Sequence, residues 1–148
     1  MNLIERKIGI VQERVGKLEE LSVSVRSFDQ YRSSANAKDI VEKNLQVALE
    51  ACWDIAKIVI SQKGLSEPKD NQGLFVVLAE ANVISEKSLK FLVPMAGTRN
   101  ILVHGYDKVD DSVIYGFIEK HLGDFHAYLK EIKENYLLRV DKVHRQDQ

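Results

Sequence analysis

The first 25 residues space their apolar side chains at alternating intervals of four and three. The set comprises Ile4, Ile8, Val11, Val15, Leu18 and Val25, with Ser22 at the one interrupted place. This spacing returns to one side of an α-helix, whose period is 3.6 residues, and it does not fit the two-residue period of a strand. The sequence therefore predicts a long amphipathic first helix, which has to bury its apolar side against other helices.

The helical period continues after a polar break at residues 33–39. A second helix is predicted from residues that share one side, namely Val41, Leu45, Ala48, Cys52, Ile55, Ala56 and Val59. It should close at Gly64 and the segment 64–73, because Pro68 and two glycines suit a helix interior poorly. A shorter helix is predicted from about Leu74 to Ala81.

Three further helical segments follow. Ser85 is predicted to cap a short helix over 86–92, and Pro94 to open the first turn of a separate helix that ends before Gly105. Asp110 or Asp111 should cap a last long helix. The apolar stripe of that last helix would comprise Val113, Phe117, His121 or Leu122, Phe125, Leu129 and Ile132.

These patterns predict an all-α protein, an antiparallel helical bundle of four to five helices with short connections. The sequence has no internal repeat, no domain boundary and no convincing strand. We expect a single domain over residues 1–140 and a polar C-terminal tail over 141–148.

Composition excludes several classes of protein. A net charge of −1 over 148 residues gives no basic field for wrapping a nucleic-acid duplex, so any RNA contact must be local. The lone cysteine, Cys52, cannot form an intramolecular disulfide or a cysteine metal site, and its apolar neighbours favour a buried small side chain. No stretch approaches the about 20 apolar residues that span a bilayer. We expect a soluble, cytoplasmic protein without membrane contact.

Common catalytic signatures are missing. The sequence has no HExxH zinc motif, no GxxxxGK phosphate loop and no GxSxG elbow. His121 and His126 are five residues apart, which separates them by about 140° on a helix, so both are predicted to have packing or surface roles, as is His144. No metal and no cofactor are expected.

The segment RNILVHGY, residues 99–106, combines polar chemistry with core residues. Individually, Arg99 fits a surface position, His104 a partly buried helix end, and Tyr106 a packing aromatic. Together they provide the groups that can cleave a phosphodiester without metal. An imidazole with a pKa near about 6.5 can move a proton at neutral pH, and a guanidinium offers a rigid fork of donors to a phosphate.

The spacing within this segment limits how the groups can cooperate. On a regular helix Arg99 and His104 lie about 140° apart, whereas Asn100 and His104 are neighbours at i, i+4. Asn100 can therefore orient His104, but Arg99 does not easily reach the same phosphate. Either Gly105 unwinds the helix end, or a second subunit brings its own motif across a cleft.

At these residues the chain resembles the HEPN superfamily, specifically the MNT/HepT type of prokaryotic toxin. RNILVHGY looks like the Rx4HxY motif of that family, and the residues around it extend the similarity. NLQVALEACWDIAKIVI, residues 44–60, resembles the second long helix of the family, and residues 107–118 resemble the segment after the motif. The resemblance covers most of the chain and implies a small helical bundle.

The resemblance implies that Arg99 and His104 are a catalytic pair that cuts RNA without metal, the substrate's 2′-hydroxyl attacking the adjacent phosphorus. His104 would be the general base or acid, and Arg99 would hold the phosphate. Asn100 matches the polar residue after the arginine and would orient a group or contact substrate. Asp54 matches an acidic position, and it would pair with Arg99 or His104 or else be a solvated or capping carboxylate.

The resemblance also implies partners. Tyr106 matches the tyrosine to which a nucleotidyltransferase antitoxin adds AMP, and the family assembles as a homodimer with facing motifs. Lys108 and Arg32 would supply the local attraction for RNA. The predicted function is a toxin-type endoribonuclease. The alternative is a catalytically inactive HEPN module that binds a nucleotidyltransferase or its substrate.

Overall fold

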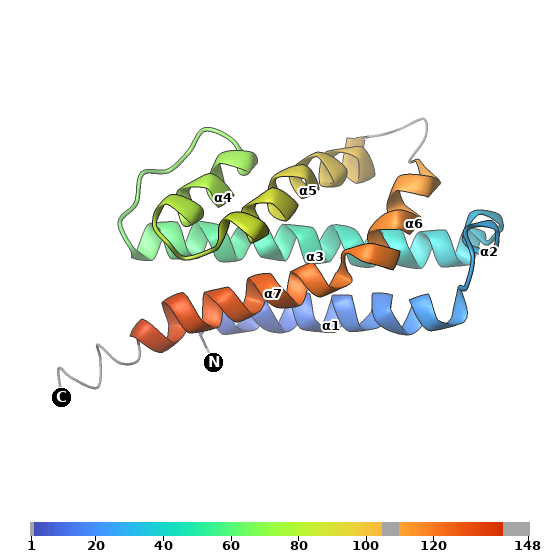
Figure 1. Ribbon diagram of the computed structural model, residues 1–148, viewed down its shortest axis with the longest axis horizontal. Coiled ribbons are helices and arrows are strands. Elements are labelled where there is room, and N and C mark those ends of the chain that lie inside the picture. Colours follow the sequence, from blue (N-terminus) through green and yellow to red (C-terminus); the bar gives the residue numbers. More distant parts are fainter. Residues whose placement is uncertain (1, 105–109, 141–148) are drawn as a thin grey trace.

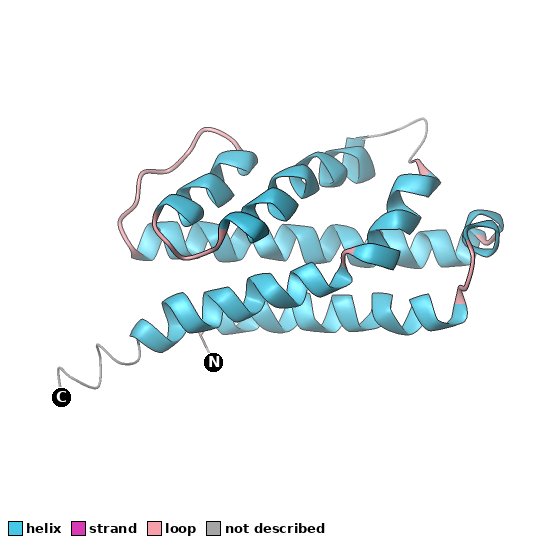
Figure 2. Ribbon diagram, in the orientation of Figure 1, coloured by secondary structure: helices cyan, strands magenta, loops and turns pink. Residues whose placement is uncertain are grey.

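The computed structural model describes residues 2–104 and 110–140, without the side chains of 96–101 and 103–104, and most of these residues are helical. No strand occurs within these residues (Figure 2). The elements are α1 (Leu3–Ser24), α2 (Phe28–Ser33), α3 (Ala35–Gln62), α4 (Asn71–Glu80), α5 (Glu86–His104), α6 (Asp111–Lys120), α7 (Leu122–Ile132) and the π-helix η1 (Lys133–Leu137). The predicted all-α fold class is confirmed.

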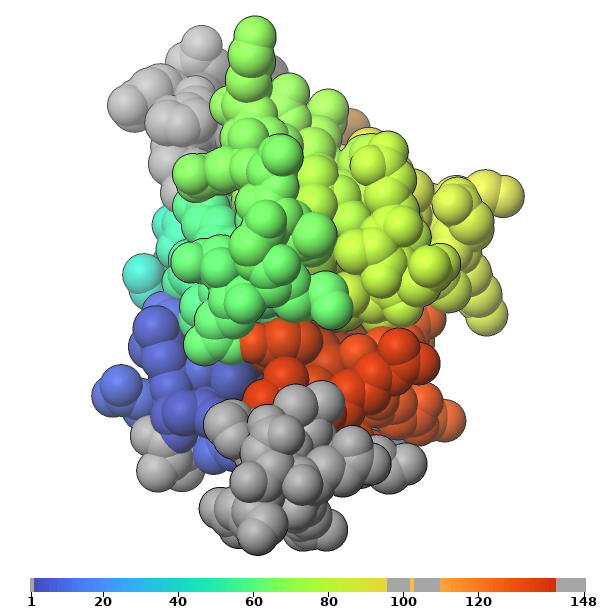
Figure 3. All heavy atoms as spheres, turned by 90° about the vertical axis from the view of Figure 1, so that its left-hand side faces the viewer, coloured from blue at the N-terminus to red at the C-terminus, as the bar shows by residue number. Residues whose placement is uncertain are grey.

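Among the described residues, four longer helices, α1, α3, α5 and α7, form the bundle, and the shorter α2, α4 and α6 pack around them. In Figure 1, α3 runs through the middle, α4 and α5 cover one side of it, and α1 and α7 lie on the other. Two contacts show that α1 and α3 are antiparallel: Lys7 pairs with Asp54 at 2.9 Å, and Arg14 donates to Asn44 at 3.0 Å. The end view in Figure 3 shows α4 and the start of α5 above α7 and α1.

The core is centred on α3, which is buried around most of its circumference. The predicted apolar side of α1 is buried at Ile4, Ile8, Val11, Val15 and Leu18. α7 adds Tyr128, whose hydroxyl donates to the carbonyl of Cys52 at 3.0 Å. Each fully buried Leu, Ile or Phe side chain stabilises the fold by about 1.5–3 kcal/mol, so this shared core holds the bundle together.

The predicted polar break at 33–39 is wrong, because two helices meet within it. Ser27 caps α2 by accepting from the amide of Gln30, and Ser34 caps α3 by accepting from the amide of Ala37. A serine that ends one helix can begin the next, so polar residues here mark a change of direction rather than a loop. α2 is fixed in place by Tyr31, which is fully buried.

The prediction of separate helices on either side of Pro94 is also wrong. α5 continues from Glu86 to His104 with Pro94 inside it. Proline removes one backbone donor, at a cost of about 3 kcal/mol in a helix interior. Here Leu92 and Met95, both buried, offset that cost by packing into the core on either side of it.

The predicted last helix is divided at His121 into α6 and α7. His121 still donates its amide to the carbonyl of Phe117, but its backbone leaves the helical region. The break turns the two parts so that Phe117, Leu122, Phe125, Leu129 and Ile132 are buried, whereas Val113, predicted in the same stripe, stays 48% exposed.

Other predicted boundaries are confirmed. Gly64 ends α3 with a φ of 66°, in the left-handed region that glycine adopts most readily. Ser85 caps α5 by accepting from the amide of Ser88 at 3.2 Å. α4 begins at Asn71, slightly earlier than expected, because Asp70 accepts from the amide of Gly73. The predicted tail, 141–148, lies outside the described residues. No helix in the described ranges is long and apolar enough to cross a membrane.

Candidate active site

Helix α5 carries three of the predicted site residues in its last two turns. Because the backbone is helical through His104, positions 99 and 104 lie about 140° apart around the axis, whereas positions 100 and 104 share one side. Position 99 continues the helical line of Ser88 and Met95, which are buried, and Leu102 packs partly buried against the core. The side chains of Arg99, Asn100 and His104 lie outside the described residues, as does Tyr106 altogether.

Asp54 lies on α3, where its carboxylate contacts α1. It forms an ion pair with Lys7 at 2.9 Å, and the two side chains are 40% and 28% exposed. A partly exposed pair of this kind contributes about 0–1 kcal/mol, so the contact leaves Asp54 free to exchange partners. Its predicted pairing with Arg99 or His104 stays a prediction.

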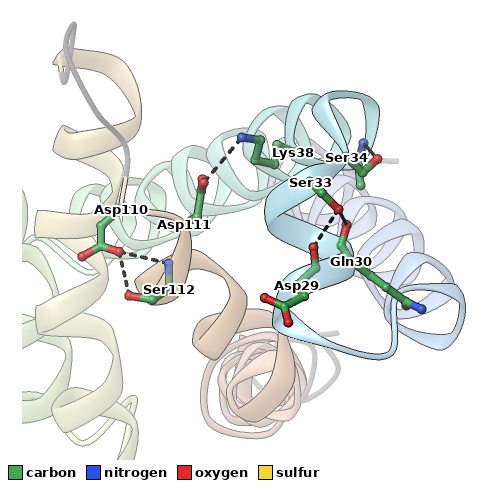
Figure 4. A network of polar contacts seen from close by, with 9 residues as sticks. Asp29, Gln30, Ser33, Ser34, Lys38, Asp110, Asp111 and Ser112 are labelled. Carbon is green, nitrogen blue, oxygen red and sulfur yellow. Dashed lines mark hydrogen bonds and ion pairs between the residues drawn. The ribbon is translucent and has the colours of Figure 1, made fainter.

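The chain after the motif is anchored at the start of α6 (Figure 4). Asp110 accepts from the amide of Ser112 at 3.0 Å and from its hydroxyl at 2.6 Å, and these bonds hold the pKa of Asp110 below its usual value. Asp111 pairs with Lys38 of α3 at 3.4 Å. α5 and these two contacts therefore fix both flanks of the segment that contains Tyr106.

Three carboxylates, those of Asp39, Glu42 and Asp111, lie near one another at this end of the bundle, with Lys38 beside them. Burial, followed by Asp111 and Asp39, raises the pKa of Glu42, and burial, followed by Glu42 and Asp111, raises the pKa of Tyr31. The Tyr31 hydroxyl is buried and has no hydrogen-bond partner among the described residues. A strand of RNA that enters here needs cations from elsewhere to offset these carboxylates.

Arg32 and Lys108 were predicted to attract RNA. Within the described residues, neither supplies a free positive charge that would balance these carboxylates. Arg32 is exposed and pairs with Asp29 at 3.3 Å, and its guanidinium lies 6.0 Å from the ring of Phe28. Lys108 lies outside the described residues. The attraction for RNA predicted from Arg32 is thus reduced by a carboxylate beside it.

Comparison with known proteins assigns the family. The model of the family described as "Ribonuclease HepT-like" matches residues 11–132. The chain belongs to the HepT-like family. The matched region runs from the middle of α1 to the end of α7, and it contains the 99–106 motif. The predicted family is thereby confirmed.

Relatives of this HepT-like chain are similar over nearly their whole length. The mRNA nuclease HepT of Shewanella oneidensis is 29% identical over 132 residues, which cover 89% of this chain and 97% of the relative. The tRNA nuclease HepT of Aphanizomenon flos-aquae is 27% identical, with 91% and 88% covered. A solved structure of the tri-AMPylated Shewanella oneidensis HEPN toxin in complex with MNT antitoxin superposes with a TM-score of 0.82 at 30% identity, with 90% and 99% covered.

Among the described residues of the HepT-like chain, no group of three or more His, Cys, Asp or Glu residues could hold a metal ion. His121 and His126 were predicted to have packing or surface roles, and this is confirmed. Each is about half exposed and pairs with one carboxylate, Asp124 or Glu19 respectively, and His121 also packs on Phe91.

A cavity of about 570 Å³ lies far from the motif, where α1 begins and α3 and η1 end. Its lining includes Asn2, Glu5, Lys63 and Arg139, together with Tyr136, whose hydroxyl donates to the side-chain oxygen of Gln62. In Figure 1 this end of the HepT-like bundle is opposite the C-terminal end of α5, so the cavity does not belong to the candidate active site.

Sequence reasoning missed several groups that the fold brings together. Lys38 and Asp111 are 73 residues apart, and Phe91 and His121 are 30 apart, yet each pair is in contact. The only local signal was aromatic: Phe117, His121 and Phe125 recur at i, i+4 and i+8. That spacing predicts a shared side of a helix but gives no information about the partner on α5.

Proposed function

We propose that this HepT-like chain is the toxin of a toxin–antitoxin pair and cuts RNA at Arg99 and His104 without a metal ion. The observation that carries the proposal is the intact RNILVHGY segment at the end of α5, within a family match that spans residues 11–132. The relatives that match most of the chain are named mRNA and tRNA nucleases. We place the protein in the cytoplasm, where RNA substrates and a reducing environment for Cys52 coexist.

The chemistry requires a proton carrier and a cationic clamp. His104 removes the proton from the 2′-hydroxyl, whose oxygen then attacks the adjacent phosphorus while the 5′-oxygen leaves and takes up a proton. The products are a 2′,3′-cyclic phosphate and a 5′-hydroxyl. Arg99 binds the phosphate oxygens, on which negative charge grows in the transition state. Asn100, one helical turn from His104, orients the imidazole. Asp54 supports Arg99 or His104 across the bundle.

The test is RNA cleavage in excess chelator with the His104→Ala and Arg99→Ala variants. His104→Ala should slow cleavage about 10²- to 10⁴-fold, because it removes the acid–base contribution. Arg99→Ala should slow it comparably, because no other group reproduces the forked donor. His126→Ala is the matched control, since that imidazole is on the surface and pairs with Glu19.

Cyclic phosphate ends on the products would identify the 2′-hydroxyl as the nucleophile. Cleavage that disappears with chelator would contradict the metal-independent mechanism. If both motif variants cut RNA as fast as the parent, the chain is instead a non-catalytic module that binds a nucleotidyltransferase or its substrate.

The proposed regulator is a cognate nucleotidyltransferase of the MNT type, which transfers AMP to Tyr106. A relative 30% identical to this chain has been solved as a tri-AMPylated toxin in complex with MNT antitoxin. Tyr106 follows His104 by two residues, so its Cα lies within about 7 Å of the histidine Cα. An AMP group there would block the site sterically and repel RNA phosphates.

Co-expression with a cognate nucleotidyltransferase of the MNT type should add one or more AMP units to the parent and abolish cleavage. Tyr106→Phe should keep the nuclease activity and escape neutralisation, because it loses the acceptor oxygen and retains the ring. Tyr115→Phe is the control, since that ring packs against Phe28 and Tyr31. Intact-mass spectrometry decides: full inhibition of an unmodified parent would mean that the partner only masks the site.

A further inference from the structure

A stack of aromatic rings reaches the surface where α5, α6 and α7 meet. Phe91 of α5 lies against His121, with ring centroids 5.6 Å apart and ring planes 27° apart. Phe117 contacts the same imidazole at 5.5 Å, and Phe125 contacts Phe91 at 5.7 Å. Phe125 is fully buried, whereas the His121 side chain is 47% exposed. The stack therefore begins in the core and ends with an imidazole open to solvent.

The imidazole is held in one orientation. Its Nδ1 hydrogen-bonds to a carboxylate oxygen of Asp124 at 2.9 Å, and the ring lies against Phe91. A carboxylate accepts, so Nδ1 carries the hydrogen. Nε2 has no partner among the described residues. A ring fixed in this way, with 47% of its side-chain surface exposed, loses little further rotamer entropy when a ligand stacks on it.

Three exposed lysines surround the stack. On α5, Lys87 lies about 40° and Lys90 about 100° around the helix from Phe91, and on α6 Lys120 lies about 60° from Phe117. None of the three forms an ion pair with any described residue. The glutamates beside them, Glu86 and Glu119, lie about 140° and 160° away from the same two phenylalanines. Lys87 and Lys120 therefore lie on the side of the aromatic stack, whereas Lys90 lies at its edge, about 40° around α5 from Glu86.

We infer that the His121–Phe91 stack and Lys87, Lys90 and Lys120 form a second binding site for single-stranded RNA. A base stacks on the imidazole and the lysines contact phosphates, which is the combination that proteins use to hold unpaired nucleotides. This subsite rests on the proposed ribonuclease function.

The subsite would contact the RNA at nucleotides away from the bond that is cut. Phe91 and Arg99 belong to the same helix, and eight residues of α5 rise about 12 Å. An RNA strand cut at the motif therefore reaches the stack within a few nucleotides. The acidic surroundings of α6's start do not attract RNA, whereas these lysines do. Stacking tolerates every base, so the subsite selects unpaired RNA of sufficient length rather than a sequence.

The stack also packs α5 against α6 and α7, so the test combines a variant that changes charge alone with one that removes only the outermost ring, His121. Lys87→Glu/Lys90→Glu changes only exposed charges. His121→Asn keeps a donor for Asp124 and loses the aromatic face. The matched control is Lys69→Glu/Lys133→Glu, which makes the same charge change at two exposed lysines outside α5 and α6. Thermal melting followed by circular dichroism checks that all variants fold.

The measurement is the affinity for an eight-nucleotide RNA with 2′-O-methyl groups, which cannot be cut by attack of the 2′-oxygen, as a function of salt. Lys87→Glu/Lys90→Glu should weaken binding at least tenfold and reduce the slope of log K against log salt by about 1.4, the value for two lost single-strand contacts. His121→Asn should weaken binding about 5- to 150-fold, the range for one base on an aromatic ring. Cleavage of a dinucleotide, which is too short to reach the stack, should stay unchanged.

Three outcomes would overturn the subsite. The Lys87→Glu/Lys90→Glu variant could bind the eight-nucleotide RNA as tightly as its control does, or it could lose dinucleotide cleavage by the same factor as RNA binding. It could also bind RNA normally and bind only the nucleotidyltransferase more weakly. The third would make the surface a protein-docking site. Binding of the methylated RNA requires no chemistry. If the subsite binds RNA but Arg99 and His104 do not cut it, this inference stands and the ribonuclease proposal is contradicted. If Arg99 and His104 cut RNA but the lysine variant binds it normally, the ribonuclease proposal stands and this inference is contradicted.

Discussion

Two tyrosines of the core differ in a single hydrogen bond. Tyr128 and Tyr31 are both fully buried, but only the Tyr128 hydroxyl has a partner, the carbonyl of Cys52. The hydroxyl of Tyr31 lies near Glu42 and Asp111, which add to the effect of burial in raising its pKa. A buried hydroxyl without a partner costs about 1–3 kcal/mol of stability.

Tyr31→Phe should therefore leave the free energy of unfolding unchanged or raise it by about 1 kcal/mol, because it removes a polar group that has no bond to lose. Tyr128→Phe, the matched substitution, should lower it by about 1 kcal/mol. Urea denaturation measures both. A loss for Tyr31→Phe as large as that for Tyr128→Phe would mean that the Tyr31 hydroxyl does bond to one of the carboxylates.

The residues of the candidate site differ in how far the sequence can predict them. Arg99, Asn100, His104 and Tyr106 lie within eight positions, so their chemistry is visible without a fold. The aromatic stack is not, because Phe91 and His121 meet only when α5 packs beside the α6–α7 break. The sequence predicted which helix carries Asp54. It did not predict the contact of Asp54 with Lys7, because that contact depends on how α1 packs against α3.

At the scale of elements, apolar periodicity predicted the long helices. The sequence signals for helix ends were correct at Gly64 and Ser85 and misleading at Pro94. The buried side of α1 follows the period residue by residue, because one continuous surface has to face the core. The sequence signal for a helix end is ambiguous at three residues, Ser34, Pro94 and His121. Each of them is compatible with a helix that ends there and with one that continues or restarts. Packing resolves the ambiguity, as Leu92 and Met95 do on either side of Pro94.

For the whole molecule, exposed apolar side chains gather at both ends of the bundle. Val23, Ile40 and Val113 are 71%, 37% and 48% exposed on helices that meet at the motif end, and Leu3 and Leu138 are 50% and 58% exposed at the opposite end. Within one chain, the regular turns of α5 keep positions 99 and 104 about 140° apart. A second copy that covers the motif end would bury apolar surface and bring the other chain's motif close.

We predict a homodimer whose interface gathers the two 99–106 segments and includes Val113, which follows them at the start of α6. Val113→Asp should weaken the dimer at least tenfold, because it places a charge where a valine would contribute about 1.5–3 kcal/mol. Leu138→Asp, at the far end, should not. Light scattering and cleavage rates on dilution test both, and a parent that is monomeric at tens of micromolar and keeps its cleavage rate would rule the dimer out.

The position of Cys52 makes the chain convenient for labelling. The thiol is fully buried in the middle of α3, and burial raises its pKa, so almost no thiolate is present at neutral pH to react. A maleimide dye should therefore ignore the natural cysteine and modify one introduced on the surface. Fluorophore pairs could be attached to α5 and α6 without first replacing Cys52, which the core needs for its shape.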